Sequence, residues 1–167
     1  ALVATAFGIT DNNTGVDDTT MSNEASGGVG NWVVSRRAAG TVGKAPTVAV
    51  VMLGTNDARY NVTPADFETD YTTWIEYQLA AGFRPEQLIL CSPIAATDAP
   101  TDQENLVKFV YIVERIASQY GCKYYNGYAA TKAASGIWQT DKLHLNQAGH
   151  TLVAEGIKAV IRADFER

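Results

Sequence analysis

The chain has 167 residues, which is enough for one compact domain with a sizeable hydrophobic core. Its net charge of −5 argues against nucleic acid and anionic membranes as partners, because both are bound by basic surfaces. No apolar run is long enough to cross a bilayer, and the first residues lack the basic and apolar regions of a signal peptide. We therefore expect a single soluble domain spanning residues 1–167, with its location left open.

The two cysteines, Cys91 and Cys122, have neither the spacing of a metal site nor a Cys-x-x-Cys pattern. We interpret both as small hydrophobic residues at strand ends. A disulfide between them is the alternative.

The N-terminal part of the chain carries weak structural signals. Residues 1–8 (ALVATAFG) fit either the end of a helix or a short strand. Residues 9–20 have the composition of turns and loops, and residues 20–31 combine a possible short strand with a glycine-rich turn. Residues 31–40 then predict a helix.

From Thr47 onward the pattern becomes regular. Residues 47–53 (TVAVVML) form a continuous apolar run, which is typical of a strand buried on both faces. Helices with apolar positions at helical spacing then alternate with short strands. We expect a helix from Thr63 to Gly82, a strand from Gln87 to Cys91, a helix ending at Gly121, a strand from Cys122 to Tyr125, loop or mixed structure over residues 127–140, and a final helix through Ile161.

Strands that alternate with helices predict βαβ units with right-handed crossovers. The expected fold is a three-layer α/β/α sandwich with a mostly parallel, flavodoxin-like sheet. In such open sheets the functional groups gather beyond the carboxyl ends of the strands. Residues 54–57 follow one strand directly, and the segment from Asp141 to His144 can lie near the end of another.

The segment from Asp141 to His150 (DKLHLNQAGH) places an aspartate three residues before a histidine. Histidine accepts a proton near neutral pH, and a carboxylate on its other ring nitrogen fixes the tautomer and stabilises the imidazolium. Asp141 can serve His144 in this way within one turn of chain. The alternative is that Asp141 only caps the following segment while His144 packs or faces solvent.

Two further segments can take part in the same chemistry. GTND, residues 54–57, is an ordinary turn after a strand, or a place where Asn56 aims its side-chain amide at an oxyanion. The glycines Gly27, Gly28 and Gly30 form either a flexible turn or a site where a backbone N–H reaches a ligand.

Together these segments resemble the SGNH (GDSL-type) hydrolase superfamily over nearly the whole chain. GTND matches the family's Gly-x-Asn-Asp block. DKLHLNQAGH matches the Asp-x-x-His block with its trailing Leu-Asn-x-x-Gly-His, and NEASGG, residues 23–28, resembles the glycine block. The order of the blocks and the intervals between them agree with the family.

The resemblance implies an ester hydrolase that acts through an acyl-serine intermediate, without a metal or an organic cofactor. It implies that His144 is the general base and that Asp141 is its orienting carboxylate. Asn56 is implied to donate its side-chain amide to the oxyanion hole, together with the backbone N–H of Gly28, for which Gly27 is the alternative.

Several residues near these blocks are given lesser roles. Asp57 is implied to brace the loop that holds the oxyanion amide, rather than to take part in the chemistry. His150 is interpreted as structural, at the start of the last helix. Arg59 and Tyr60 follow the GTND block and are assigned no role.

The sequence departs from the family at the nucleophile. The family's serine lies in a Gly-Asp-Ser block after the first strand, and this sequence contains no Gly-Asp-Ser. Thr10, Ser22 and Ser26 are poor substitutes. We expect instead that residues 1–8 end the family's first helix, and that the first strand and its serine precede Ala1.

Three interpretations stay open. The first is an esterase for small acyl (acetyl-type) esters of carbohydrates or simple alcohols, completed by the missing serine. The second is a catalytically altered module that binds carbohydrate or acts in adhesion. The third is an α/β domain of another kind that resembles the family by chance.

Overall fold

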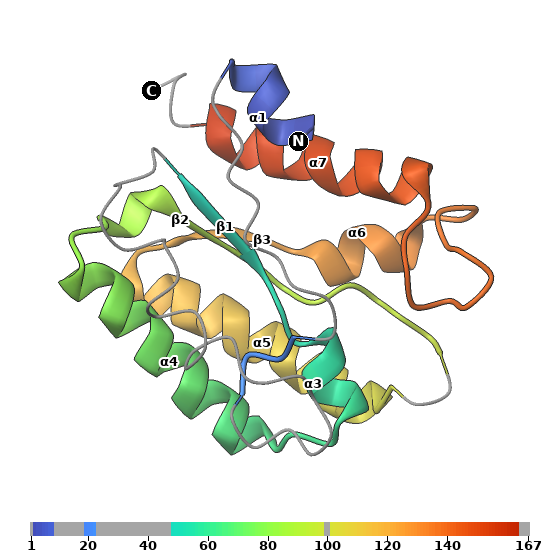
Figure 1. Ribbon diagram of the computed structural model, residues 1–167, viewed down its shortest axis with the longest axis horizontal. Coiled ribbons are helices and arrows are strands. Elements are labelled where there is room, and N and C mark those ends of the chain that lie inside the picture. The colour runs from blue at the N-terminus through green and yellow to red at the C-terminus, as the bar shows by residue number, and fades with distance from the viewer. Residues whose placement is uncertain (1, 9–18, 23–47, 99–100, 164–167) are drawn as a thin grey trace.

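The computed structural model describes residues 2–8, 19–22, 48–98 and 101–163, whose arrangement is shown in Figure 1. The helix predicted at residues 31–40 and the glycine-rich turn before it lie outside these ranges. The described elements are, in chain order, α1 (Leu2–Phe7), β1 (Ala49–Met52), α3 (Thr55–Arg59), α4 (Pro64–Ala80), the 3₁₀ helix η1 (Pro85–Gln87), β2 (Leu88–Cys91), α5 (Gln103–Tyr120), β3 (Lys123–Tyr125), α6 (Gly127–Ala133) and α7 (Gln147–Arg162).

Three parallel strands form the sheet, in the order β1-β2-β3. In the middle strand, Leu90 is aligned with Val51 of β1 and with Tyr124 of β3. All four residues of β2 are buried, as expected for a strand with partners on both edges and helices on both faces. The parallel sheet predicted from the alternation of strands and helices is confirmed.

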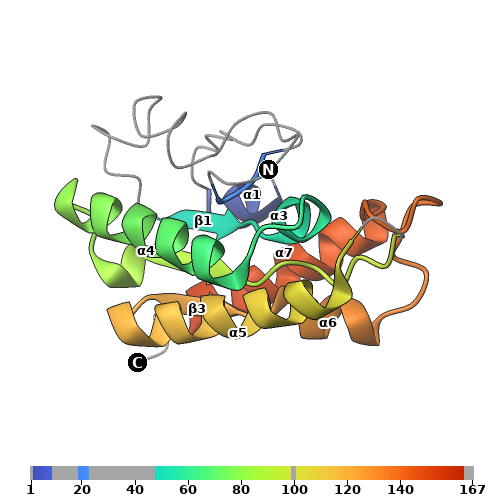
Figure 2. The ribbon, with the colours of Figure 1, turned by 90° about the horizontal axis from the view of Figure 1, so that it is seen from below.

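Helices cover both faces of this sheet. α4 and α5 lie side by side on one face (Figures 1 and 2), and α1 packs against α7 on the other. Successive residues of β2 accordingly enter different cores: Leu88 and Leu90 pack towards α4 and α5, whereas Ile89 packs towards α7. At the centre of the first core, the rings of Phe67 and Phe109 stack with centroids 4.2 Å apart. The predicted three-layer α/β/α arrangement is therefore present.

The burial of β1 differs from the expectation. Val51 is buried in the core beneath α4 and α5, but Val50 and Met52 are 42% and 38% exposed. On the face of the sheet that carries these two side chains, α7 contacts β3 and packs against Ile89 of β2. It therefore covers β2 and β3 and leaves β1 partly exposed. The prediction that this strand is buried on both faces is therefore wrong for β1 and holds only for β2.

α4 and α5 begin and end where local sequence signals place them. The hydroxyl of Thr63 accepts the N–H of Asp66 at the start of α4, and Gly82, with φ 98°, follows its end. Asp102 caps α5 in the same way, and Gly121 ends that helix with φ 70°, in the left-handed region that favours glycine. None of the helices within the described ranges is long and apolar enough to cross a membrane.

Two helices resolve segments that the sequence left open. α1 shows that Leu2–Phe7 are helical rather than extended. α6 lies in the segment expected to be loop or mixed structure. It is capped by Asn126, whose side chain accepts the N–H of Ala129. With seven residues, α6 is too short to show a helical period in the sequence.

Both cysteines are free thiols, and their interpretation as buried small hydrophobic residues holds for Cys91, whereas Cys122 is only half-buried. Burial raises the pKa of Cys91 to about 12 and that of Cys122 to about 11. Since the thiolate is the reactive form, both side chains are chemically inert near neutral pH.

A buried carboxylate holds residues 19–22 against α3. Asp57 is fully buried, and its oxygens accept the N–H of Met21 at 3.0 Å and of Ser22 at 2.8 Å. The hydroxyl of Ser22 also donates to Asp70 of α4 at 2.9 Å. Burial raises the pKa of Asp57 to about 6, the nearby charge of Asp70 adds to this effect, and the backbone hydrogen bonds oppose it.

Gly149, in the first turn of α7, leaves no room for a side chain. A Cβ there would lie 2.6 Å from the carbonyl oxygen of Ile137 and 2.9 Å from the side chain of Leu145. We expect Gly149→Ala to lower the free energy of unfolding by about 1–3 kcal/mol, because the backbone on either side of the contact must move apart. Thr151→Ala, at an exposed position of the same helix, should change it by less than about 0.5 kcal/mol. Urea unfolding measures both, and equal stability of the two variants would contradict this contact.

Asp57 should make stability fall as pH rises. Its pKa is about 6 in the folded protein against 3.8 for an exposed carboxyl, so the folded state holds this proton more tightly. The resulting stabilisation is complete below about pH 4 and is lost as pH rises through 6, by roughly 3 kcal/mol. Asp57→Asn cannot titrate. The unfolding free energy of the wild type minus that of Asp57→Asn should therefore decrease by this amount between pH 4 and pH 7.5. A difference that stays constant with pH would contradict the raised pKa.

Candidate active site

Asp141 and His144 meet in the turn that precedes α7. One carboxylate oxygen of Asp141 lies 2.7 Å from Nδ1 of His144, and the other accepts the N–H groups of Leu143 and His144 at 3.0 Å each. These bonds, the one with the imidazole foremost, lower the pKa of Asp141 to about 2. The ionised carboxylate keeps the ring proton on Nδ1, which leaves Nε2 able to accept another proton. The structure thus brings this predicted pair together, and both side chains are exposed.

Backbone hydrogen bonds hold this turn in place. The N–H of Gln139 donates to the carbonyl of His144 at 2.8 Å, which closes the loop across its base. Lys142, at the tip, has φ 56°, and its carbonyl accepts the N–H of Thr97 at 3.0 Å. Thr97 lies in the loop that follows β2, so the turn is fixed relative to the carboxyl end of the central strand.

Asn56 lies in the first turn of α3, immediately beyond β1. Gly54 before it has φ 118°, and a Cβ at that position would lie 3.3 Å from Phe67 and from Pro93. Both facts explain why glycine begins the GTND block. Nδ2 of Asn56 donates to the carbonyl of Thr19 at 3.2 Å. This bond orients the amide and uses one of its two N–H groups, so the second can be directed at an oxyanion.

The remaining predicted donor, Gly28, lies outside the described residues, together with its alternative Gly27 and with Ser26 and Thr10. Ser22 is described and is fully buried. Its hydroxyl donates a hydrogen bond to the carboxylate of Asp70, so it links residues 19–22 to α4. Among the described residues, the partner of the His144 ring is a carboxylate and not a serine hydroxyl.

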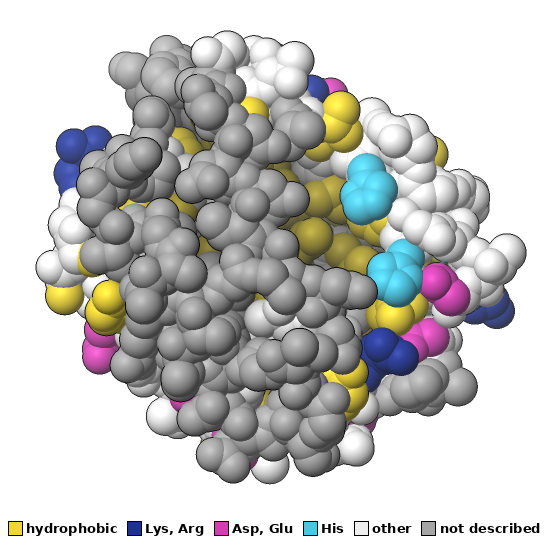
Figure 3. All heavy atoms as spheres, viewed as in Figure 1, with side chains coloured by type: hydrophobic (Ala, Val, Ile, Leu, Met, Phe, Trp, Pro, Cys, Tyr) yellow, Lys and Arg dark blue, Asp and Glu magenta, His cyan; other side chains and the backbone are white. Residues whose placement is uncertain are grey.

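The two histidines of the chain lie on one face of the molecule, beside a hollow with a hydrophobic floor (Figure 3). His150 is exposed in the first turn of α7. Within the described ranges, His144 has a carboxylate partner and His150 does not. In the part of the chain that the structure covers, no three His, Cys, Asp or Glu side chains gather to hold a metal ion. A cavity of about 480 Å³ between α1 and α7 is lined by Leu2, Val3, Gln147, His150, Val153, Ala154 and Ile157.

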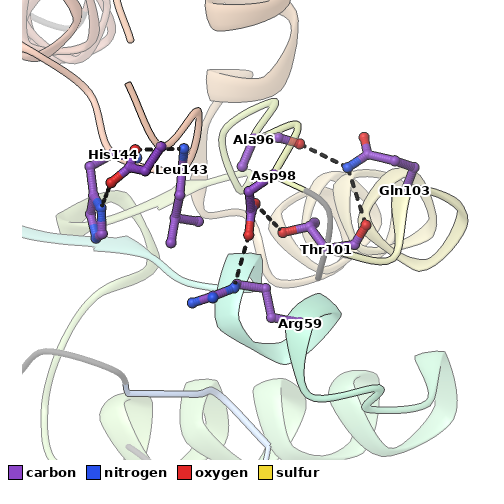
Figure 4. A network of polar contacts seen from close by, with 8 residues as sticks. Arg59, Ala96, Asp98, Thr101, Gln103, Leu143 and His144 are labelled. Atoms are coloured by element: carbon purple, nitrogen blue, oxygen red, sulfur yellow. Dashed lines mark hydrogen bonds and ion pairs between the residues drawn. The ribbon is translucent and has the colours of Figure 1, made fainter. Parts of the chain in front are cut away.

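A polar network that the sequence did not predict connects α3 with the His144 turn (Figure 4). Nε of Arg59, in α3, lies 3.1 Å from Oδ2 of Asp98 in an ion pair, and the hydroxyl of Thr101 donates to Oδ1 at 2.5 Å. Asp98 follows Thr97, which binds the His144 turn. Polar residues after neighbouring parallel strands meet at one edge of the sheet. That rule predicts that the segments after β1 and β2 lie near each other, but it does not predict that Arg59 pairs with Asp98.

Comparison with known proteins agrees with this architecture. The model of the GDSL-like lipase/acylhydrolase family matches residues 2–152. No curated protein matches the chain. Among solved structures, the chain is similar to the lipase/acylhydrolase from Enterococcus faecalis, with a TM-score of 0.63 and 24% sequence identity over 72% of this chain and 63% of that one. The chain thus spans less than two thirds of the length of that protein.

Two esterase structures are also similar. One is the acetyl xylan esterase AlAXEase, with a TM-score of 0.60 and 20% identity over 70% of this chain and 67% of that one. Another is an acetylxylan esterase from Geobacillus stearothermophilus, with a TM-score of 0.58 and 18% identity over 70% of this chain and 59% of that one. At these identities the structures establish a shared fold. Together with the family match over residues 2–152, they show that the chain belongs to the GDSL-like lipase/acylhydrolase (SGNH) family.

Proposed function

We propose that this chain provides the base and the oxyanion donors of a serine esterase. The observation that carries the proposal is the 2.7 Å contact between the Asp141 carboxylate and Nδ1 of His144, in a turn fixed to the carboxyl end of the central parallel strand. Nε2 lies on the opposite side of this exposed ring, where it can act on a reacting group. Because the pKa of Asp141 is about 2, this carboxylate is ionised near neutral pH.

In the proposed reaction, Nε2 of His144 removes the proton of a serine hydroxyl, and that oxygen attacks the carbonyl carbon of the ester. Negative charge develops on the carbonyl oxygen, to which the amide of Asn56 and the backbone N–H of Gly28 donate. The imidazolium then protonates the alcohol oxygen as the bond between carbon and that oxygen breaks, which leaves an acyl-serine. Water, deprotonated by His144, releases the acid by the reverse sequence.

We place the nucleophilic serine on a further strand, preceding Ala1, that pairs with the open edge of β1. Among the described strands, β1 pairs only with β2, and its side chains Val50 and Met52 are partly exposed. A parallel strand on this edge would end beside Asn56, which lies directly beyond β1. This part of the proposal requires a Gly-Asp-Ser in the sequence upstream of Ala1 in the natural protein, and a different sequence there would contradict it.

The proposed substrates are small acyl esters, such as acetyl groups on carbohydrate. Two of the similar structures are acetyl xylan esterases, which supports this choice of acyl group.

The second candidate function is a catalytically altered module that binds carbohydrate. It is favoured by one observation, the lack of Gly-Asp-Ser in this sequence. Labelling of the natural protein with a fluorophosphonate separates the two functions. A labelled serine supports the esterase, whereas binding of a xylooligosaccharide without any labelling supports the module.

Replacement of the base should abolish hydrolysis. We expect His144→Ala to lower kcat for p-nitrophenyl acetate by at least about 10³-fold, because His144 is, among the described residues, the histidine that a carboxylate orients as a base. His150→Ala is the matched control, since His150 is exposed on the same face and should leave kcat unchanged. The turnover assay checks both variants, and an unchanged rate in His144→Ala would rule out this base.

Removal of the amide should slow the reaction without weakening substrate binding. Asn56→Ala is expected to lower kcat roughly 10²–10³-fold, with little change in KM, because the donor acts mainly on the transition state. Asn105→Ala is the control, since its side chain also donates to a backbone carbonyl, that of Val62, but lies in α5. Steady-state kinetics should show a normal kcat for the control. A normal kcat in Asn56→Ala itself would show that the oxyanion donor lies elsewhere.

A further inference from the structure

Arg59 lies on the active edge, three residues after Asn56 in α3. Residues three apart on a helix share one face, about 5–6 Å apart at Cβ. The side chain of Arg59 is 26% exposed, whereas that of its partner Asp98 is only 9% exposed. Arg59 is therefore paired at its Nε with a nearly buried carboxylate, by charge and not by a hydrogen bond, while part of its side chain remains open to solvent.

Asp98 is itself fixed, which makes it a firm anchor. Its second oxygen accepts the hydroxyl of Thr101, and the backbone of Thr97 binds the His144 turn through Lys142. Figure 4 shows the guanidinium end of Arg59 extending past Asp98 to the side on which His144 lies. The Arg59 head group thus lies on the His144 side of Asp98, at the edge of the sheet that also carries Asn56 in α3.

The terminal nitrogens of Arg59 are the part of this group that can bind a ligand. The anchor uses Nε, and within the described ranges the terminal nitrogens have no ion-pair partner. They offer the planar set of N–H donors that a guanidinium carries. Because Asp98 neutralises the guanidinium charge and the chain carries a net charge of −5, a neutral oxygen acceptor suits this site better than an anion.

The position of Arg59 decides which part of the substrate it meets. Asn56 is the donor to the carbonyl oxygen, and Arg59 lies one helical turn beyond it. An acetyl group ends at its methyl and presents no acceptor at that distance. The oxygen that reaches Arg59 must therefore belong to the alcohol part of the ester, as it does in a sugar with neighbouring hydroxyl groups.

We propose that Arg59 is a specificity residue that donates hydrogen bonds to hydroxyl or ring oxygens of a carbohydrate alcohol, so that the site prefers acetylated sugars to acetyl esters of plain alcohols. This inference rests on the proposed esterase function and names the substrate class of that same site. The competing explanation is that Arg59 and Asp98 only connect α3 with the loop after β2. A purely structural link would affect all acetyl esters equally.

The test compares two acetyl esters in the natural protein, acetylated xylobiose and p-nitrophenyl acetate. With Arg59→Met, kcat/KM for acetylated xylobiose should fall about 10–100-fold, mainly through KM, which corresponds to losing hydrogen bonds from a charged donor. For p-nitrophenyl acetate it should stay within about twofold. Arg115→Met is the matched control, because Arg115 is an exposed arginine of α5 paired with Glu68, and it should change neither value.

Each outcome decides the inference. Equal losses on the two esters, or no loss on either, would overturn the specificity role. Binding of acetylated xylobiose to His144→Ala, measured by calorimetry, tests Arg59 separately from turnover. Addition of Arg59→Met to that variant should weaken Kd about tenfold, and an unchanged Kd would again overturn the role. A wild-type protein that hydrolyses neither ester would instead contradict the proposed function.

Discussion

Asp141 accepts three hydrogen bonds, one from the imidazole of His144 and two from the backbone of the turn that carries it. The same two oxygens therefore shape the turn and orient the ring, which remains exposed to solvent. An exposed ring is not held by surrounding side chains, so its orientation depends on the turn. The position of the turn depends on the hydrogen bond from the N–H of Thr97 to the carbonyl of Lys142, and on the close approach of α7 at Gly149. Packing around a short loop thus controls the chemistry of one side chain.

The opposite side of the site is built by the same means, from a segment distant in the chain. The amide of Asn56 is oriented by the carbonyl of Thr19, and the next residues of that segment are held by the buried Asp57. Burial of a carboxylate costs free energy, which its two backbone hydrogen bonds offset in part. The site therefore combines a buried brace, Asp57, whose pKa is about 6, with a base on the opposite side whose partner, Asp141, has a pKa of about 2.

Features that depend on neighbouring residues could be predicted from the sequence. The cap at Thr63 and the helix end at Gly121 involve atoms within a few residues of each other, and the Asp141–His144 pair spans three positions. Features that depend on distant contacts could not. The bond from Asn56 to Thr19 joins residues 37 positions apart, and the ion pair between Arg59 and Asp98 joins α3 to the loop after β2. The strand β1 was predicted, but its partial exposure could not be, because its run of apolar residues does not reveal how far the helices extend over it.

One edge of β1 has no partner among the described strands, which bears on how the described fold behaves in solution. An unpaired edge presents backbone N–H and C=O groups in the spacing that any extended chain can match. Here Val50 and Met52 add exposed apolar side chains beside that edge. The strand, Ala49–Met52, contains no charged residue and no proline, which are the residues that discourage a neighbouring chain from pairing with a strand edge. Self-association of the described fold would begin at this edge, and its dependence on protein concentration would reflect strand addition rather than contacts at the active site.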